Sequence, residues 1–144
     1  ESVRHREKDA MYLFDTDTVS ALMRAGSESP LNGRIGNIPF HQQFISSITL
    51  SELVYGAYCS NRPGYHLEMI RDVLLPSIQV ATFDAQAACQ AGKLRAHLKK
   101  AGNPIDFPDL QIAAIALARG LTLVTGNTRH FIRVPDLAVE NWMT

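Results

Sequence analysis

Apolar residues between positions 11 and 144 follow two different spacings. Short, continuous apolar runs are typical of strands buried on both faces, whereas apolar residues three and four positions apart are typical of amphipathic helices. The runs predict strands at residues 11–15, 44–48, 78–81 and 121–125, with a further candidate at 137–141. The helical spacing predicts helices at residues 17–24, 50–59, 65–74, 85–100 and 108–119.

The alternation of strands with helices predicts an α/β fold with a mostly parallel sheet that is covered on both faces. The glycine and proline positions agree, because Gly102-Asn103-Pro104 closes one predicted helix and Gly120 closes the next, directly before a strand. Residues 27–39 are rich in Gly, Pro and Ser, and we expect them to be irregular or weakly helical. Ligands of open parallel sheets bind outside the carboxyl ends of the strands, which is where we expect the chemistry.

Three carboxylates from distant parts of the chain fall at such positions. Asp15 ends the first predicted strand, Glu52 begins the helix after the second, and Asp109 opens the last long helix. Carboxylates held a few ångströms apart repel and raise one another's pKa unless a cation lies among them. Mg²⁺ or Mn²⁺ is the natural occupant of an oxygen-only site, where it activates water for phosphodiester hydrolysis. The sequence therefore predicts a metal-dependent hydrolytic site.

Each of these acids also has a purely structural interpretation. Thr49 and Glu52 have the spacing of a capping box at a helix start. Asp106 can cap the last long helix with Asp109 in its first turn, and Asp17 can cap the first helix. Capping explains less well why a buried strand should itself end in an aspartate and why acids recur at one edge of the sheet.

Composition bounds the class of protein. A chain of 144 residues with 46% hydrophobic residues is expected to form one globular domain. Its 14 Lys and Arg balance its 14 Asp and Glu, so a nucleic-acid partner must be held by a local patch. Cys59 and Cys89 lie in apolar surroundings and are expected to be reduced core residues rather than zinc ligands or a disulfide.

Two further expectations concern the ends and the location of the protein. Residues 1–10 are almost entirely polar, and we expect a disordered or cloning-derived extension before a folded domain at 11–144. No run approaches the roughly 18 apolar residues that a membrane helix needs. We therefore expect a soluble, cytoplasmic protein without a membrane partner.

The stretch DTDT at residues 15–18 fits the D-x-D-x-T signature of haloacid-dehalogenase-like phosphatases, in which the first aspartate is the nucleophile. LTLVTGN, with Thr125, resembles the second motif of that family. The family also needs a lysine and an acidic pair downstream of this threonine. Here the residues after Thr125 include no lysine and a single aspartate, Asp136, so this phosphatase is the weaker alternative.

Residues 11–144 as a whole resemble the PIN-domain ribonucleases, specifically the toxins of VapC-type toxin–antitoxin pairs. The matching segments are MYLFDTDTVS, ISSITLSELVYGA, FDAQAACQAGKLRAHLKKAGNPI, DLQIAAIALARGLTLVTGNTRHF and RVPDLAVENW. The resemblance implies a three-layer α/β/α sandwich that cuts RNA with Mg²⁺ or Mn²⁺, forms a homodimer and is blocked by the tail of a small antitoxin. Asp15, Glu52 and Asp109 match the metal-binding acids of the family.

The chain departs from the family pattern at three positions. Asp17 stands where many relatives have asparagine, which adds a possible fourth oxygen ligand. Asp106 is a further acid in a loop that is often neutral in relatives. His130 occupies the place where a fourth acid commonly occurs, after T-x-N. A second metal ion is therefore less well supported than one tightly held ion.

Polar residues after the fourth strand are candidates for positioning the substrate. Thr125 and Asn127 can orient water or phosphate through hydrogen bonds, although Gly126-Asn127 is also ordinary turn chemistry. Arg129 and His130, with Arg133 beyond them, can meet RNA phosphates or an antitoxin carboxylate.

The function expected from the residues and the resemblance together is a toxin that acts as a metal-dependent endoribonuclease, with RNA and an antitoxin as partners. The alternative from a different class is a PIN-like module that has lost catalysis and only binds its partner or RNA. The complete acidic set argues against this alternative.

Overall fold

A computed structural model describes residues 10–25 and 29–143 of the chain. Its five strands form one sheet in the order β3-β2-β1-β4-β5, and every neighbouring pair is parallel. The strands are β1 (Tyr12–Phe14), β2 (Gln43–Ser46), β3 (Gln79–Ala81), β4 (Thr122–Val124) and β5 (Val139–Glu140). Each of the five predicted strands is present, although each is shorter than its apolar run.

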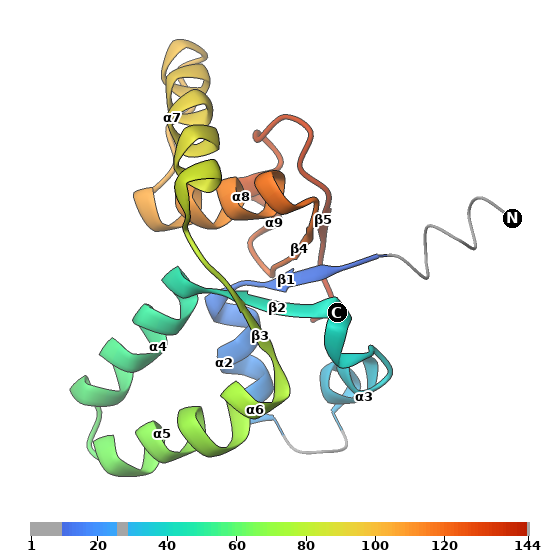
Figure 1. Cartoon of the computed structure of the whole chain (residues 1–144), viewed down its shortest axis with the longest axis vertical. Helices are drawn as coiled ribbons and strands as arrows, with labels where there is room; N and C mark the ends of the chain where they lie inside the picture. Colours follow the sequence, from blue (N-terminus) through green and yellow to red (C-terminus); the bar gives the residue numbers. More distant parts are fainter. Residues whose placement is uncertain (1–9, 26–28, 144) are drawn as a thin grey trace, which may run out of the picture.

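Helices cover the two faces of this sheet (Figure 1). Helices α7, α8 and α9 lie on one face of the sheet, while α2, α3 and α6 lie on the other. The helices are α2 (Thr16–Arg24), α3 (Pro30–Gly36), α4 (Ser47–Cys59), α5 (Pro63–Met69), α6 (Leu75–Ser77), α7 (Ala85–Lys100), α8 (Phe107–Arg119) and α9 (Thr128–Phe131), with a 3-10 turn η1 (Phe40–Gln42) and a π-helical turn η2 (Ile70–Leu74). The three-layer α/β/α architecture with a parallel sheet is confirmed.

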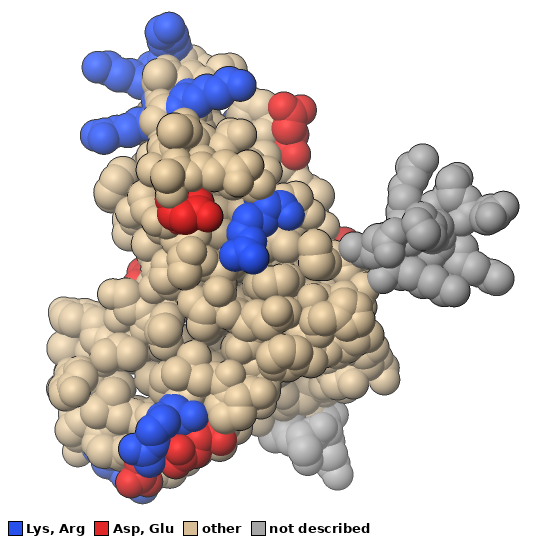
Figure 2. All heavy atoms as spheres, in the orientation of Figure 1, with Lys and Arg blue, Asp and Glu red and all other residues tan. Residues whose placement is uncertain are grey.

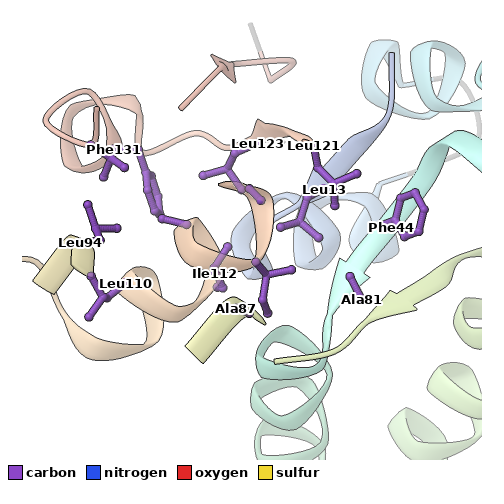
Figure 3. Close-up of a cluster of buried hydrophobic side chains, with 14 of the residues drawn as sticks. Leu13, Phe44, Ala81, Ala87, Leu94, Leu110, Ile112, Leu121, Leu123 and Phe131 are labelled. Carbon is purple, nitrogen blue, oxygen red and sulfur yellow. The ribbon is translucent and has the colours of Figure 1, made fainter. Parts of the chain in front are cut away.

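The alternation of side chains along each strand builds two separate cores. Leu13 of β1 pairs in register with Phe44 and Leu123, and all three pack against α7 and α8 (Figure 3). The next residue, Phe14, pairs with Ile45 and faces the opposite core. Because both faces of the sheet are buried, the strands read as continuous apolar runs in the sequence.

The start of α4 differs from the expectation. The second strand was expected to reach residue 48 and Thr49 to cap the helix, but β2 ends at Ser46 and α4 begins at Ser47. The Ser46 hydroxyl is the cap, because it accepts a hydrogen bond from the Thr49 backbone N–H at 2.9 Å. The capping-box interpretation of Thr49 and Glu52 is therefore wrong.

Two further differences concern the segment after α4 and the two cysteines. The helix expected at residues 65–74 runs from α5 through η2 into α6, and η2 is π-helical. Pro76 has no N–H and its ring crowds the carbonyl one turn earlier, which gives a physical reason for the widened turn. Cys59 and Cys89 are free thiols, as expected, but both are exposed rather than in the core.

Residues 30–36 form α3, a regular helix within the stretch expected to be irregular or weakly helical. Leu31 and Ile35, four positions apart, are buried beneath it and anchor it to the sheet.

Residues 27 and 28 of that stretch, and residues 1–9 of the expected extension, lie outside the described residues. None of the helices in the described part of the chain is long and apolar enough to cross a membrane.

Candidate functional site at the carboxyl edge of the sheet

Asp15 lies at the centre of the edge where the strands end. It directly follows β1 and is the N-cap of α2, since its Oδ1 accepts a hydrogen bond from the Thr18 backbone N–H at 2.9 Å. Its Oδ2 accepts a hydrogen bond from the hydroxyl of Thr125, the residue after β4, at 2.5 Å. The helix cap expected at Asp17 is therefore at Asp15, and the strand-ending aspartate has a structural role as well.

The two threonines that hold Asp15 are themselves fixed by the fold. The Thr18 hydroxyl donates to the Val124 carbonyl at 3.1 Å, and the Thr125 hydroxyl accepts from the Asn127 backbone N–H at 2.9 Å. Both threonine side chains are fully buried. Burial raises the pKa of the Asp15 carboxyl above its ordinary 3.8, although the hydrogen bonds that Thr125 and Thr18 donate to this carboxyl lower it.

Asp17 lies beside this cluster in the first turn of α2 and is exposed. Its Oδ2 accepts a hydrogen bond from the Asn127 side-chain amide at 2.9 Å, which ties the turn after β4 to α2. The charge of Asp17 also contributes to the raised pKa of Asp15. Asp17 therefore stands next to Asp15, with one of its oxygens engaged by Asn127.

Asp109 approaches the same edge from the first turn of α8. Burial raises the pKa of its carboxyl, and the charges of Asp106 and Asp15 raise it further, whereas His130 lowers it. The Nδ1 atom of His130 lies 3.7 Å from the Asp109 Oδ2 atom. Because the charge of Asp15 acts on Asp109, two carboxylates separated by 94 positions in the chain are close enough to repel.

Glu52 belongs to the same edge but points toward α2. It is exposed in the second turn of α4, and its Oε1 accepts a hydrogen bond from the Thr16 hydroxyl at 2.5 Å. The Thr16 hydroxyl also lies 3.1 Å from that of Thr49. Glu52 is thus held at the mouth of a groove between α2 and α4 with a volume of about 350 Å³.

The carboxylate oxygens at this edge suit a hard cation, but they do not form a closed coordination site. Among residues 10–25 and 29–143, no three Asp, Glu, His or Cys side chains converge closely enough to hold a metal ion. The charge of Asp15 acts on Asp109, while Glu52 accepts a hydrogen bond from Thr16. All the donors are carboxylate oxygens, the ligands that Mg²⁺ and Mn²⁺ prefer, and a cation between them would offset their repulsion.

The remaining residues expected at the site occupy the loop after β4. Thr125 is buried with its hydroxyl used by Asp15 and Asn127, so it orients Asp15. Arg129 and His130 are exposed on α9, a short helix that the sequence pattern did not predict. Buried Phe131 anchors that helix, and a single apolar residue in a four-residue helix leaves no periodic signal.

Asp106 does not fulfil the capping role considered for it. It is the residue before α8, but its side chain makes no capping hydrogen bond. Instead its charge acts on Asp109, three residues further on. Nearby, the Arg133 side chain donates a hydrogen bond to the Pro104 carbonyl at 3.0 Å, so the loop after α9 braces the loop before α8.

Comparisons with known proteins agree with this arrangement. The family model of the PIN domain matches residues 12–137. The tRNA(fMet)-specific endonuclease VapC of Salmonella typhimurium is 40% identical over 106 residues, which cover 74% of this chain and 80% of that protein. The protein of the same name from Shigella flexneri is 45% identical over 98 residues, covering 68% of this chain and 74% of the relative.

A solved structure shows the same fold. The crystal structure of DNA-bound VapBC from Salmonella typhimurium superimposes with a TM-score of 0.85 at 34% identity, over 92% of this chain and 98% of that chain. PIN-domain ribonucleases generally use a divalent metal ion. Because the PIN-domain model matches residues 12–137, the phosphatase alternative suggested by DTDT is wrong. The chain belongs to the PIN-domain family and, within it, to the VapC ribonucleases.

Proposed function

We propose that this protein is the toxin of a VapC-type toxin–antitoxin pair and hydrolyses RNA phosphodiesters with the help of Mg²⁺ or Mn²⁺. The observation that carries the proposal is the pair Asp15 and Asp109, two carboxylates from opposite ends of the chain whose pKa values are both raised at one edge of the sheet. Perturbed carboxylates in such a position are typical of functional sites.

Asp15, Asp109 and Glu52 would hold the ion, with Asp17 beside them. Asp15 and Asp109 lie close enough for the charge of Asp15 to act on Asp109, and Glu52 would join them by giving up its hydrogen bond from Thr16. When bound, such an ion supplies positive charge for the phosphate and lowers the pKa of a water molecule. One ion is proposed rather than two, because His130 replaces a further acid.

The other residues of this edge position these groups. Thr18 and Thr125 leave each Asp15 oxygen with a free lone pair, since a carboxylate oxygen accepts more than one hydrogen bond. Asn127 holds Asp17, and Arg129 and His130 stand exposed at the rim, where they can contact RNA phosphates. Transfer RNA, for which the Salmonella and Shigella relatives are named, is the substrate class that we propose.

The proposed partners are a cognate antitoxin and a second copy of the chain, in the cytoplasm. VapBC structures are assemblies of this fold with an antitoxin. The groove between α2 and α4 begins at Glu52 and Thr16 and continues over Leu53, so a segment lying in it would end beside the acids. Tyr55 and Tyr58 are exposed on α4 and offer an aromatic surface for dimerisation.

The decisive experiment measures cleavage of purified tRNA with Mn²⁺ by the parent protein and by Asp15→Asn and Asp109→Asn. Each variant is expected to lose at least about 100-fold in rate, because even the neighbours of metal ligands contribute 10- to 100-fold. Asp136→Asn is the matched control. Asp136 has a left-handed backbone, with φ of 65°, which asparagine tolerates, and it precedes β5 at the opposite edge of the sheet. Equal cleavage by all four proteins would refute the metal mechanism.

A further inference from the structure

A second concave surface lies next to the acidic edge. It has a volume of about 500 Å³ and lies between the last two turns of α7 and the loop that leads into α8. Its lining includes Arg95 and Lys99 from α7 and Pro104, Asp106 and Phe107 from the loop and the start of α8. The lining does not include Asp15, Asp17, Glu52 or Asp109, and Asp106 is the one acid that it shares with the surroundings of Asp109.

Phe107 gives this pocket an aromatic wall. Its side chain is 53% exposed although it is the first residue of a helix whose inner face is buried. The guanidinium carbon of Arg95 lies 5.6 Å from the centre of the Phe107 ring, within the range of a cation–π interaction. Because about half of the Phe107 side chain is exposed, a further flat group such as a nucleobase can stack on its ring beside the Arg95 guanidinium.

Two cations, Arg95 and Lys99, and one acid, Asp106, line the pocket. Lys and Arg side chains gather on the end of the molecule formed by α7 (Figure 2). Lys99 and Lys100 lie in the last turn of α7, where the helix dipole alone would favour them. The dipole does not explain Arg95, which lies before the last turn and stacks on Phe107. In a chain without net charge, this local patch is what a nucleic-acid partner requires.

The pocket is connected to the acidic edge through its loop. Asp106, which lines the pocket, is close enough to Asp109 for its charge to act on that carboxyl. Arg133 donates to the Pro104 carbonyl and so adds a third cation to the same loop. Phe107 and Leu110, which also line the pocket, flank Asp109 at the start of α8, so a ligand in the pocket would lie beside Asp109.

We propose that this pocket is a subsite for one unstacked nucleotide of the RNA substrate, with its base on Phe107 and its phosphate facing Arg95 and Lys99. The inference rests on the proposed ribonuclease function and extends it to a residue that positions the substrate. A nucleotide combines a flat base with a negative charge a few ångströms away, which matches the ring and the two cations. A protein segment that filled the pocket would need no such pairing.

The test compares Phe107 with Phe40, the matched control. Phe40 is 52% exposed and lies in η1, before β2, at the opposite edge of the sheet. Binding of fluorescein-labelled tRNA is measured by anisotropy in Asp15→Asn protein, which leaves the RNA intact. Phe107→Ala is expected to weaken binding about tenfold, within the range for loss of one stacked base. Phe40→Ala is expected to bind like its parent, and thermal unfolding checks that both variants are folded.

A conservative variant separates stacking from packing. Phe107→Trp is expected to restore the affinity, and its added indole fluorescence should be quenched when tRNA binds. Phe40→Trp should show no quenching. The background is low because the chain has one tryptophan, Trp142, which is buried. Unchanged affinity in Phe107→Ala, or an unquenched indole in Phe107→Trp, would overturn the subsite.

The two proposals fail in different ways. If Phe107→Ala cleaves tRNA with the KM of the parent, the subsite is refuted and the ribonuclease function stands. If the parent does not cleave tRNA with Mn²⁺ but Phe107→Ala still binds it more weakly than Phe40→Ala, the hydrolytic function is refuted and the nucleotide subsite stands. If Phe107→Ala weakens only the complex with the cognate antitoxin, the occupant is protein and the RNA proposal is wrong.

Discussion

Asp15 and Asp109 carry the same chemical group at the same edge of the sheet, but the fold holds them in opposite ways. Asp15 is 5% exposed, and each of its oxygens accepts a hydrogen bond from a fixed threonine donor. The side chain of Asp109 is 30% exposed, and within the described part of the chain its side-chain polar contact is the half-exposed His130, at 3.7 Å. Asp15 is therefore part of the scaffold, whereas Asp109 can adjust to a ligand.

Glu52 belongs with Asp109 in this comparison. It is exposed, and its hydrogen bond from Thr16 lies at the surface, where water can replace it. The proposed site therefore combines one rigid acid with two more exposed ones. Stability and catalysis should therefore respond differently to substitutions on the two sides.

The largest difference is expected from truncating each aspartate. Asp15→Ala removes a helix cap and leaves the buried Thr125 hydroxyl without its acceptor, so the free energy of unfolding should fall by about 2 kcal/mol. Asp109→Ala should change it by less than about 1 kcal/mol, as for other partly exposed positions. Urea unfolding at pH 7, followed by circular dichroism, measures both values. Equal losses would show that the two acids are held alike.

Thr125 offers a sharper test of the rigid side. Thr125→Val keeps the shape but removes the hydroxyl, which should cost about 1–2 kcal/mol of stability. Because the hydrogen bond from Thr125 lowers the pKa of Asp15, its loss should also move the rise of cleavage activity to higher pH. Thr125→Ser keeps the hydroxyl and should retain the profile of the parent. A shift in the serine variant as large as that in the valine variant would contradict this role.

The dependence of stability on pH should follow the buried carboxyl. The pKa of Asp15 is raised in the folded protein above its ordinary 3.8, so the folded state keeps a proton that the unfolded chain has released. This group therefore lowers the free energy of unfolding as pH rises from the unfolded value to the folded value. Asp15→Asn, which can still cap α2, should gain stability relative to the parent across that interval and keep the gain above it. Urea titrations from pH 3 to pH 8 test this, and parallel curves would refute it.

The smallest effect is expected at His130. Its interaction with Asp109 is long and half exposed, so His130→Gln should change stability by less than about 1 kcal/mol. Since His130 lowers the pKa of Asp109, its removal should shift the acid limb of the cleavage profile slightly upward. His41→Gln, on η1 at the opposite edge, is the control and should leave the profile unchanged.

The spacing of apolar residues was sufficient to predict the fold. A strand buried on both faces must be apolar at every position, as at Leu13 and Phe14, and a long amphipathic helix such as α7 repeats its buried residues often enough to be recognised. Short elements held by one or two side chains, such as α3 and α9, produce too few repeats for this. Pro76 marks a position where a regular helix is disturbed, but the resulting π turn depends on the packing around it.

The residue types and order in the chain were enough to select Asp15, Glu52 and Asp109, because parallel strands must end at a common edge. Local sequence could not reveal which acid would be buried, since the donors that hold Asp15 include Thr125, 110 positions away. The same limit applies to the Asn127 contact with Asp17 and to the pocket at Phe107, whose walls come from two helices. Contacts between distant segments depend on how the layers pack, and this packing sets the burial and the charge environment on which each carboxylate depends.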